Sequence, residues 1–352
     1  MSKFWSKRAH ELDPYTPGEQ PQNQQYIKLN TNENPYPPSP KAIKAMRAAS
    51  NESMRLYPDP HAKNLKQAIA DFYDLDVEQV FVGNSSDEVL AHTFVGLLKQ
   101  DKPIFFPDIS YGFYPAYCGL YNIEATRIPL ADDFTIHAED YEKENGGIIF
   151  PNPNAPSGIA LSLADIEKIL KANPDVVVVI DEAYIDFGAD TAVPLIAKYP
   201  NLLITQTFSK SRSLAGLRVG FAMGHAELIE GLERVKNSFN SYPLDRAAIA
   251  GATASINDKA HFESICQKII TTREKTSTTL KAMDFTVLPS KTNFVFAKPN
   301  KADAEKLYLD LKEQGILVRY FSAPRIDGFL RITIGADDEM DVFLQTLSGL
   351  LS

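Results

Sequence analysis

The sequence is poor in cysteine and has no long hydrophobic run. Its two cysteines, Cys118 and Cys266, lie far apart, so we expect no disulfide framework, and a reducing cytoplasm fits. The purest apolar run, residues 176–180, has five residues, whereas a membrane-spanning helix needs about 20. The N-terminus also lacks the apolar segment of a signal peptide. We therefore expect a cytoplasmic protein without a membrane partner.

Positive charge is also scarce. Lys and Arg number 36 against 45 Asp and Glu, a net charge of −9, which disfavours non-specific binding to nucleic acid. The six histidines show no spacing typical of metal ligands, so we expect no metal site. With 44% hydrophobic and 23% charged residues, the composition is that of an ordinary soluble globular protein.

Short apolar segments alternate with helical patterns from about residue 42 to residue 225. Several of these segments are apolar without alternation, which is typical of parallel strands covered on both faces. The pattern predicts a three-layer α/β fold with a mainly parallel sheet. Ser162, with Asp165 three residues later, is expected to cap one helix. The predicted strands are 80–82, 103–106, 147–150, 176–180, 202–205 and 219–223, and the predicted helices are 62–73, 86–99 and 163–172.

The pattern changes after residue 223. The polar first 30 residues, with prolines such as Pro14 and Pro21, are expected to lie as an extended arm. We predict an N-terminal arm at residues 1–35, a large domain at 36–258 and a small α+β domain at 259–352. The predicted helices are 227–239, 246–257, 261–283, 302–314 and one from about residue 338, and the predicted strands are 285–288, 293–297, 316–320 and 329–334.

Polar, turn-rich segments follow five of the predicted strands. They begin at Gly83, Pro107, Asn152, Asp181 and Thr207. Ligands of open α/β sheets bind beyond the carboxyl ends of the strands. Each segment alone is compatible with an ordinary loop, but five on one edge of a sheet favour a binding site.

The most informative of these segments contains Lys210, among small hydroxyl residues, and Arg218 eight residues later. A lysine just after a buried strand is suited to form a Schiff base with an aldehyde cofactor, and the arginine could hold the phosphate of that cofactor. The alternatives are a solvent-exposed lysine and a structural ion pair. Asp181 follows five apolar residues, and a buried carboxylate needs a partner such as a protonated pyridine nitrogen. Its alternative role is to cap a turn.

Three further features have both a binding and a structural interpretation. The segment 83–87 opens a predicted helix, whose free N–H groups suit a phosphate, but Ser85 or Ser86 could equally be a plain N-cap. Tyr111 could stack on a flat ring or belong to the core. Tyr184, three residues after Asp181, could bond a phenolic oxygen of the same ring.

Taken together, these residues resemble the fold-type I pyridoxal-phosphate (PLP) aminotransferases over nearly the whole chain. Within that family they are most similar to the histidinol-phosphate aminotransferases. The combination of Asp181, Lys210 and Arg218 is specific for the cofactor class, whereas related aromatic enzymes share most of the rest. The segments that carry the resemblance are 13–15 (DPY), 30–35 (NTNENP), 55–59 (RLYPD), 181–184 (DEAY), 207–210 (TFSK), 215–218 (AGLR), 242–244 (YPL), 292–294 (TNF), 318–319 (VR) and 330–333 (LRIT).

The resemblance implies a role for each matching residue. Lys210 forms the Schiff base and moves protons, Asp181 pairs with the pyridinium nitrogen, and Tyr184 bonds the phenolic oxygen. Tyr111 stacks on the ring. Tyr57 reaches the phosphate from a neighbouring subunit, which implies a homodimer with shared active sites. The other residues implied around the cofactor are Ser85, Ser86, Asp87, Thr207, Ser209 and Arg218.

The resemblance also implies a substrate site. Arg331 matches the arginine that binds the substrate anion, while Arg319 and Tyr15 match positions that hold the phosphate of histidinol phosphate. Two arginines suit a dianion. Asn293 completes the implied set.

One position departs from the family. Ala155 stands where the family has an asparagine that bonds the phenolic oxygen of the ring. We expect Asn154 to reach the ring in its place, with Asn152 or a water molecule as alternatives.

The implied reaction is transamination of histidinol phosphate with 2-oxoglutarate, giving imidazole acetol phosphate and glutamate in histidine biosynthesis. One alternative is an aromatic or broad-specificity amino-acid aminotransferase, and another is a PLP-dependent decarboxylase of a phosphorylated amino acid. A cofactor-binding regulatory domain is disfavoured, because the sequence has no basic helix-turn-helix segment.

Overall fold

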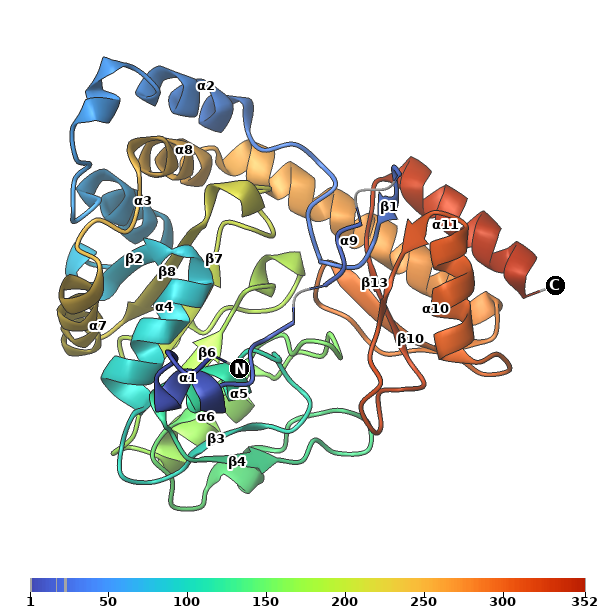
Figure 1. Cartoon of the computed structure of the whole chain (residues 1–352), viewed down its shortest axis with the longest axis horizontal. Coiled ribbons are helices and arrows are strands. Elements are labelled where there is room, and N and C mark those ends of the chain that lie inside the picture. Colours follow the sequence, from blue (N-terminus) through green and yellow to red (C-terminus); the bar gives the residue numbers. More distant parts are fainter. Residues whose placement is uncertain (1, 17, 22–23, 352) are drawn as a thin grey trace.

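The computed structural model describes residues 2–16, 18–21 and 24–351. Residues 1, 17, 22–23 and 352, which include part of the predicted arm, lie outside the described residues. Two main sheets organise the described chain, and the long helix α9 (Lys259–Ala282) runs between them (Figure 1). We call the two halves the large-sheet part and the small-sheet part.

The larger sheet has seven strands in the order β2-β8-β7-β6-β5-β3-β4. Strands β3 to β7 run parallel, and β8 is antiparallel to both of its neighbours. The predicted mainly parallel sheet is therefore confirmed. Strand β4 was not predicted, because three of its four residues are exposed. The strands are β2 (Val80–Asn84), β3 (Ile104–Pro107), β4 (Ala125–Ile128), β5 (Ile148–Pro151), β6 (Val178–Asp181), β7 (Leu202–Thr207) and β8 (Val219–Gly224).

Helices cover both faces of this sheet. Val178 and Ile180 of β6 belong to one core, and Val179 between them belongs to the other. This alternation explains why the strands are apolar throughout. Ser162 caps α6 through its Oγ, which accepts from the N–H of Asp165 as predicted. The helices on one face are α3 (Lys63–Tyr73), α6 (Leu163–Ala172) and α8 (Arg246–Ile256), and those on the other are α4 (Ser85–Thr93), α5 (Tyr114–Tyr121) and α7 (Ala226–Phe239).

The smaller sheet has four antiparallel strands in the order β12-β13-β10-β9. The predicted strand 316–320 is in fact two strands that join different sheets, since β11 pairs with β1 of the N-terminal segment and β12 pairs with β13. The elements are β1 (Ile27–Lys28), β9 (Phe285–Val287), β10 (Phe294–Pro299), β11 (Ile316–Leu317), β12 (Arg319–Tyr320), β13 (Leu330–Thr333), α10 (Ala304–Glu313) and α11 (Asp337–Leu350).

The N-terminal segment is less extended than the sequence suggested. It contains the short helix α1 (Lys7–Glu11), and Arg8 Nε donates to the Leu120 carbonyl on α5, 3.3 Å away. Farther along, Glu19 contacts Tyr308 and Lys312 of α10. The segment therefore touches both parts of the molecule. The remaining short elements are α2 (Pro40–Ala49), a π-helical turn at Phe94–Leu98, and 3-10 turns at Glu52–Arg55, Val77–Gln79, Ala138–Tyr141, Ile185–Phe187, Val193–Leu195 and Ala215–Leu217.

Among the described helices, not one is both long enough and apolar enough to cross a membrane.

Candidate active site

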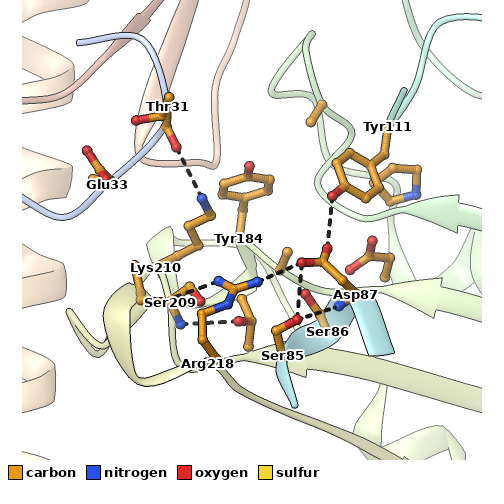
Figure 2. A pocket seen from close by; sticks show the side chains of 16 residues that line it. Thr31, Glu33, Ser85, Ser86, Asp87, Tyr111, Tyr184, Ser209, Lys210 and Arg218 are labelled. Atoms are coloured by element: carbon orange, nitrogen blue, oxygen red, sulfur yellow. Dashed lines mark hydrogen bonds and ion pairs between the residues drawn. The ribbon is translucent and has the colours of Figure 1, made fainter. Parts of the chain in front are cut away.

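A cavity of about 240 Å³ lies at the carboxyl ends of the parallel strands, beside the N-terminal segment. Figure 2 shows the side chains that converge on it. The predicted residues that line it are Ser85, Ser86, Asp87, Tyr111, Asp181, Tyr184, Thr207, Ser209, Lys210 and Arg218, and the other lining residues are Thr31, Glu33, Pro151, Ala155, Ala183 and Ala215.

Lys210 lies just beyond β7, and its amine enters the cavity. Lys210 Nζ donates to the Thr31 carbonyl 3.2 Å away and lies 5.8 Å from the centre of the Tyr184 ring. Asn34 Nδ2 donates to the Lys210 carbonyl at 2.8 Å. Residues 31–34 thus contact the lysine at both its amine and its backbone. An amine placed in this way can reach an aldehyde in the cavity.

Asp181 ends strand β6 and is only 5% exposed. Tyr114 Oη donates to its Oδ2 at 3.1 Å, and Thr205 Oγ1 donates to its Oδ1 at 3.4 Å. Burial nevertheless raises the pKa of the Asp181 carboxyl to about 6, because the two hydroxyl donors only partly replace water. No lysine, arginine or histidine of the described residues forms an ion pair with it. A cationic ring nitrogen would supply the missing counter-charge.

An anion-binding corner forms where α4 begins. Ser85, with φ +67°, and Ser86 open this helix and line the cavity; the Ser85 N–H donates to the Arg218 carbonyl and the Asp87 N–H to Ser85 Oγ. Arg218 Nη2 pairs with Asp87 Oδ2 at 2.7 Å across the same corner. A Cβ at Gly220 would lie 2.2 Å from the Ser86 nitrogen, so only glycine lets β8 approach the helix start so closely. Helix N–H groups, hydroxyls and a guanidinium are the groups that hold a phosphate.

Two tyrosines flank the cavity on its other sides (Figure 2). Tyr111 Oη donates to Asp87 Oδ1 at 3.2 Å, and burial raises the pKa of Tyr111 above its usual value. Its ring meets the ring of Tyr114 edge-on, with centroids 5.6 Å apart. Tyr184 Oη accepts a hydrogen bond from Asn32 Nδ2 at 2.9 Å. Both rings are fixed by their neighbours, as a binding surface for a flat ligand requires.

Asn154 is not among the residues that line the cavity, whereas Ala155 is. Asn154 Nδ2 donates to the Ile109 carbonyl at 3.0 Å and to Ser157 Oγ at 3.2 Å, so the amide joins its own turn to the segment after β3. Asn152 is likewise bonded in both directions to Leu161. The structure therefore does not place either asparagine where the predicted contact with a ring would need it, and a methyl group occupies that wall.

The four predicted substrate residues lie outside this lining set. Arg331 Nη2 donates to the Asn30 carbonyl at 2.7 Å, while its Nε is buried with no partner among the described residues. Burial lowers the pKa of this guanidinium. The guanidiniums of Arg331 and Arg319 lie 5.6 and 5.3 Å from the centre of the Phe321 ring. Two positive groups thus contact one aromatic ring.

Tyr15 and Asn293 contact residues of the cavity wall or of the segment beside it. The Tyr15 ring lies 4.8 Å from the ring of Phe113 and 6.5 Å from that of Tyr111. Asn293 is fully buried, and its Nδ2 donates to the Asn32 carbonyl at 3.0 Å. Asn293 therefore supports the N-terminal segment in this structure.

Tyr57 does not reach the cavity of its own chain. It is 78% exposed and stacks on Tyr242, with ring centroids 4.7 Å apart. Met54 and Leu56 beside it are about half exposed. These apolar side chains form an uncovered patch on the chain, which we call the Tyr57 patch.

Residues 30–34 were quoted for the family resemblance, but no role was assigned to Thr31, Asn32 or Glu33. Thr31 and Glu33 line the cavity, and Asn32 stands behind Tyr184. Tyr114, the donor to Asp181, was also missed. The density of amide and hydroxyl side chains in segment 30–34 was the available signal.

Comparison with known proteins gives the family. Residues 24–347 match the family described as aminotransferase class I and II. The chain belongs to this family. This aminotransferase is 59% identical to histidinol-phosphate aminotransferase 1 of Hydrogenovibrio crunogenus, covering 100% of this chain and 99% of that one. It is 60% identical to histidinol-phosphate aminotransferase of a Marinomonas species, and the match covers 99% of this chain and 100% of that one.

A solved structure supports the fold of this aminotransferase. The histidinol-phosphate aminotransferase of Sinorhizobium meliloti, in complex with pyridoxal-5'-phosphate, superposes with a TM-score of 0.89. The match covers 100% of this chain and 98% of that chain at 22% sequence identity. The predicted fold class, a large mainly parallel sheet with a small α+β part, is therefore confirmed.

Proposed function

We propose that this aminotransferase uses pyridoxal 5'-phosphate to transfer the amino group of histidinol phosphate to 2-oxoglutarate. The observation that carries the proposal is the convergence of the Lys210 amine, the buried Asp181 carboxyl and the anion-binding corner on one cavity. The substrate follows from relatives of 59% and 60% identity over the full chain, which are named histidinol-phosphate aminotransferases.

When bound, pyridoxal phosphate supplies an electron sink that stabilises negative charge on the substrate carbon. The residues around it have distinct tasks. Lys210 would hold the cofactor through its amine. When the substrate amine takes its place, the freed Lys210 amine would move a proton between the substrate carbon and the cofactor carbon. Asp181 would keep a proton on the ring nitrogen, because its buried charge has hydrogen-bond donors but no counter-cation within the described residues. Arg218 and the start of α4 hold the phosphate.

The substrate phosphate is assigned to Arg319 and Arg331. No carboxylate of the described residues lies within ion-pair distance of either guanidinium. An arginine without a carboxylate partner favours an anionic ligand, and two such arginines suit a phosphate dianion. Tyr15, which packs against the cavity wall, is placed to cover this end of the site.

The working unit is a homodimer in which Tyr57 of one copy completes the cavity of the other. The exposed Tyr57 patch supports this assignment, because tyrosine and other large apolar side chains at a surface mark contact sites. Complementation tests it. When Lys210→Ala and Tyr57→Ala subunits are unfolded and refolded together, mixed dimers regain one intact site, so activity should exceed that of either variant. Activity equal to the mean of the two variants would show that the sites are not shared.

The reaction itself is tested with a panel of amino donors and 2-oxoglutarate, with glutamate as the measured product. Histidinol phosphate should give the highest kcat/KM, ahead of phenylalanine, tyrosine and aspartate. Equal or higher values for phenylalanine would indicate an aromatic aminotransferase instead. Release of CO2 from a phosphorylated amino acid without a keto acid would indicate a decarboxylase.

A further inference from the structure

Asn32 is buried, 1% exposed, and held in one orientation by bonds on three sides. The backbone N–H of Asn32 donates to Thr333 Oγ1 at 3.0 Å, and the Thr333 hydroxyl donates in turn to the side-chain Oδ1 of Asn32 at 3.0 Å. The backbone carbonyl of Asn32 accepts a hydrogen bond from Asn293 Nδ2. A flipped side-chain amide would take the acceptor away from the Thr333 hydroxyl, which is itself only 1% exposed. Its φ of +56° is a conformation that asparagine tolerates well.

The remaining group of this side chain, the NH2, donates to Tyr184 Oη at 2.9 Å. A phenol hydroxyl has one proton to give and lone pairs that accept. Since Asn32 can only donate here, Tyr184 keeps its own proton for another acceptor. Tyr184 lines the cavity, beside Lys210 (Figure 2). Its proton is therefore available to a ligand in the cavity.

We propose that Asn32 is a positioning residue that makes Tyr184 a hydrogen-bond donor toward the cofactor. The inference rests on the proposed role of Tyr184 as the partner of the ring's phenolic oxygen. Ala155 increases the importance of that partner, because a methyl group can donate nothing to the ring. Asn32 acts through Tyr184 and does not itself line the cavity.

The direction of this hydrogen bond has a measurable effect. Donation from Tyr184 stabilises negative charge on the phenolic oxygen. That oxygen then attracts the neighbouring imine proton less, and the proton is lost at a lower pH. If the donor is turned away, the imine should keep its proton to a higher pH.

Asn32→Asp is the variant that reverses the bond. Aspartate has nearly the same shape, still accepts from Thr333, and accepts from Tyr184 where asparagine donated. The variant is reconstituted with pyridoxal phosphate, and its visible absorbance is recorded against pH. We expect the midpoint of the absorbance change to rise by about one pH unit, a tenfold change in proton affinity. Tyr184→Phe, which removes the donor, should shift it in the same direction.

Two matched variants separate this role from a structural one and from the added charge. Asn32→Gly deletes the amide without adding an acceptor, and glycine tolerates the left-handed backbone. Tyr184 keeps its proton but loses the bond that directs it, so the midpoint should rise, though less than in Asn32→Asp. Asn32→Asp in the Tyr184→Phe background adds only the charge, and there it should produce less than half of its usual shift.

The outcomes distinguish the inference from the proposed function. An unchanged midpoint in Asn32→Gly, or a full shift for Asn32→Asp without Tyr184, would overturn the role of Asn32 while leaving Tyr184 in place. An unchanged midpoint in Tyr184→Phe would overturn both the role of Tyr184 and the inference that rests on it. Thermal unfolding of each variant checks that the fold is intact.

Discussion

The lining of the candidate site and the arginine pair outside that lining, which we call its two walls, differ in how their positive charges are balanced. In the large-sheet part, Arg218 is paired with Asp87 at 2.7 Å, and the Lys210 amine is bonded to the Thr31 carbonyl. In the small-sheet part, Arg319 and Arg331 have no carboxylate of the described residues within ion-pair distance. The first wall therefore contains an internal ion pair, whereas the second has none and its Arg331 donates to the Asn30 carbonyl.

The difference corresponds to two kinds of ligand. Groups that are bonded to one another before a ligand arrives are held in their binding positions, which suits a cofactor that stays through many turnovers. A buried guanidinium without a counter-charge costs free energy that an incoming anion recovers. This suits a substrate that binds and leaves in each cycle. Four variants test the contrast, beginning with the cofactor wall.

Lys210→Ala should have the largest effect. No other group in the cavity can replace the amine as both nucleophile and proton carrier, so we expect kcat to fall by about 10⁴-fold or more. Steady-state rates and the visible absorbance of the imine measure the loss. Lys301→Ala, at a lysine that is 87% exposed, is the control and should be active. Normal turnover without Lys210 would contradict the assignment.

Asp181→Asn should have the next largest effect. The variant removes the negative charge beside the ring nitrogen, and we expect kcat to fall by about 10²–10³-fold, as when a preorganised electrostatic contact is removed. The adjacent Glu182→Gln is the matched control, because Glu182 is also buried but does not line the cavity. It should change kcat by about threefold at most. Comparable losses in the two variants would indicate a general packing effect.

Arg319→Ala tests the wall of unpaired arginines. A charged hydrogen bond to a phosphate is worth about 1.5–3 kcal/mol, so kcat/KM for histidinol phosphate should fall by about 10- to 100-fold. With phenylalanine as donor, the change should stay within about threefold. The ratio of the two kcat/KM values is the measurement. An equal loss with both donors would remove Arg319 from phosphate binding.

Glu182→Gln should have the smallest effect on turnover but a clear effect on stability. Burial raises the pKa of Glu182 from 4.5 to about 7, although Thr191 Oγ1, the Ala192 N–H and Gln206 Nε2 all donate to it. A carboxyl whose pKa is raised by folding stabilises the protein when protonated, and this contribution is lost as pH rises from about 4.5 to 7.

The variant has no such titration. The free energy of unfolding of the apoprotein is measured with urea at pH 5 and at pH 8. Its drop between these two pH values should be smaller in the variant than in the unmodified protein, by up to about 3 kcal/mol. Asp181 still titrates in both proteins, so some dependence remains. An unchanged pH dependence in the variant would show that Glu182 is not protonated more easily in the folded state.

Much of the large-sheet part could be predicted, because its signal is local. Six strands were predicted as apolar runs, and ten residues predicted from strand ends or from the family resemblance line one cavity. Strand β4 escaped because it is short and exposed at the sheet edge. Asn154 was predicted at the ring, but its Nδ2 donates to the Ile109 carbonyl and to Ser157 Oγ. Such local competition cannot be seen in residue spacing.

The substrate side depends on contacts that are distant in sequence. Asn32 has its role through Thr333 and Tyr184, 301 and 152 residues away. Tyr57 is largely exposed and stacks on Tyr242 away from its own cavity, and its proposed role needs a second copy. Residue type and spacing indicate the chemistry of such residues, but only the folded chain shows which of them meet.

The contacts of segment 30–34 also limit which insertions and deletions this part of the chain can tolerate. Asn30 bonds Arg331, Thr31 bonds Lys210, and Asn34 bonds the Lys210 and Ser211 carbonyls. Surface loops usually tolerate an inserted or deleted residue. Here, a change of one residue would move every later group out of register with a partner on another element. This segment should therefore accept substitutions far more readily than any change in its length.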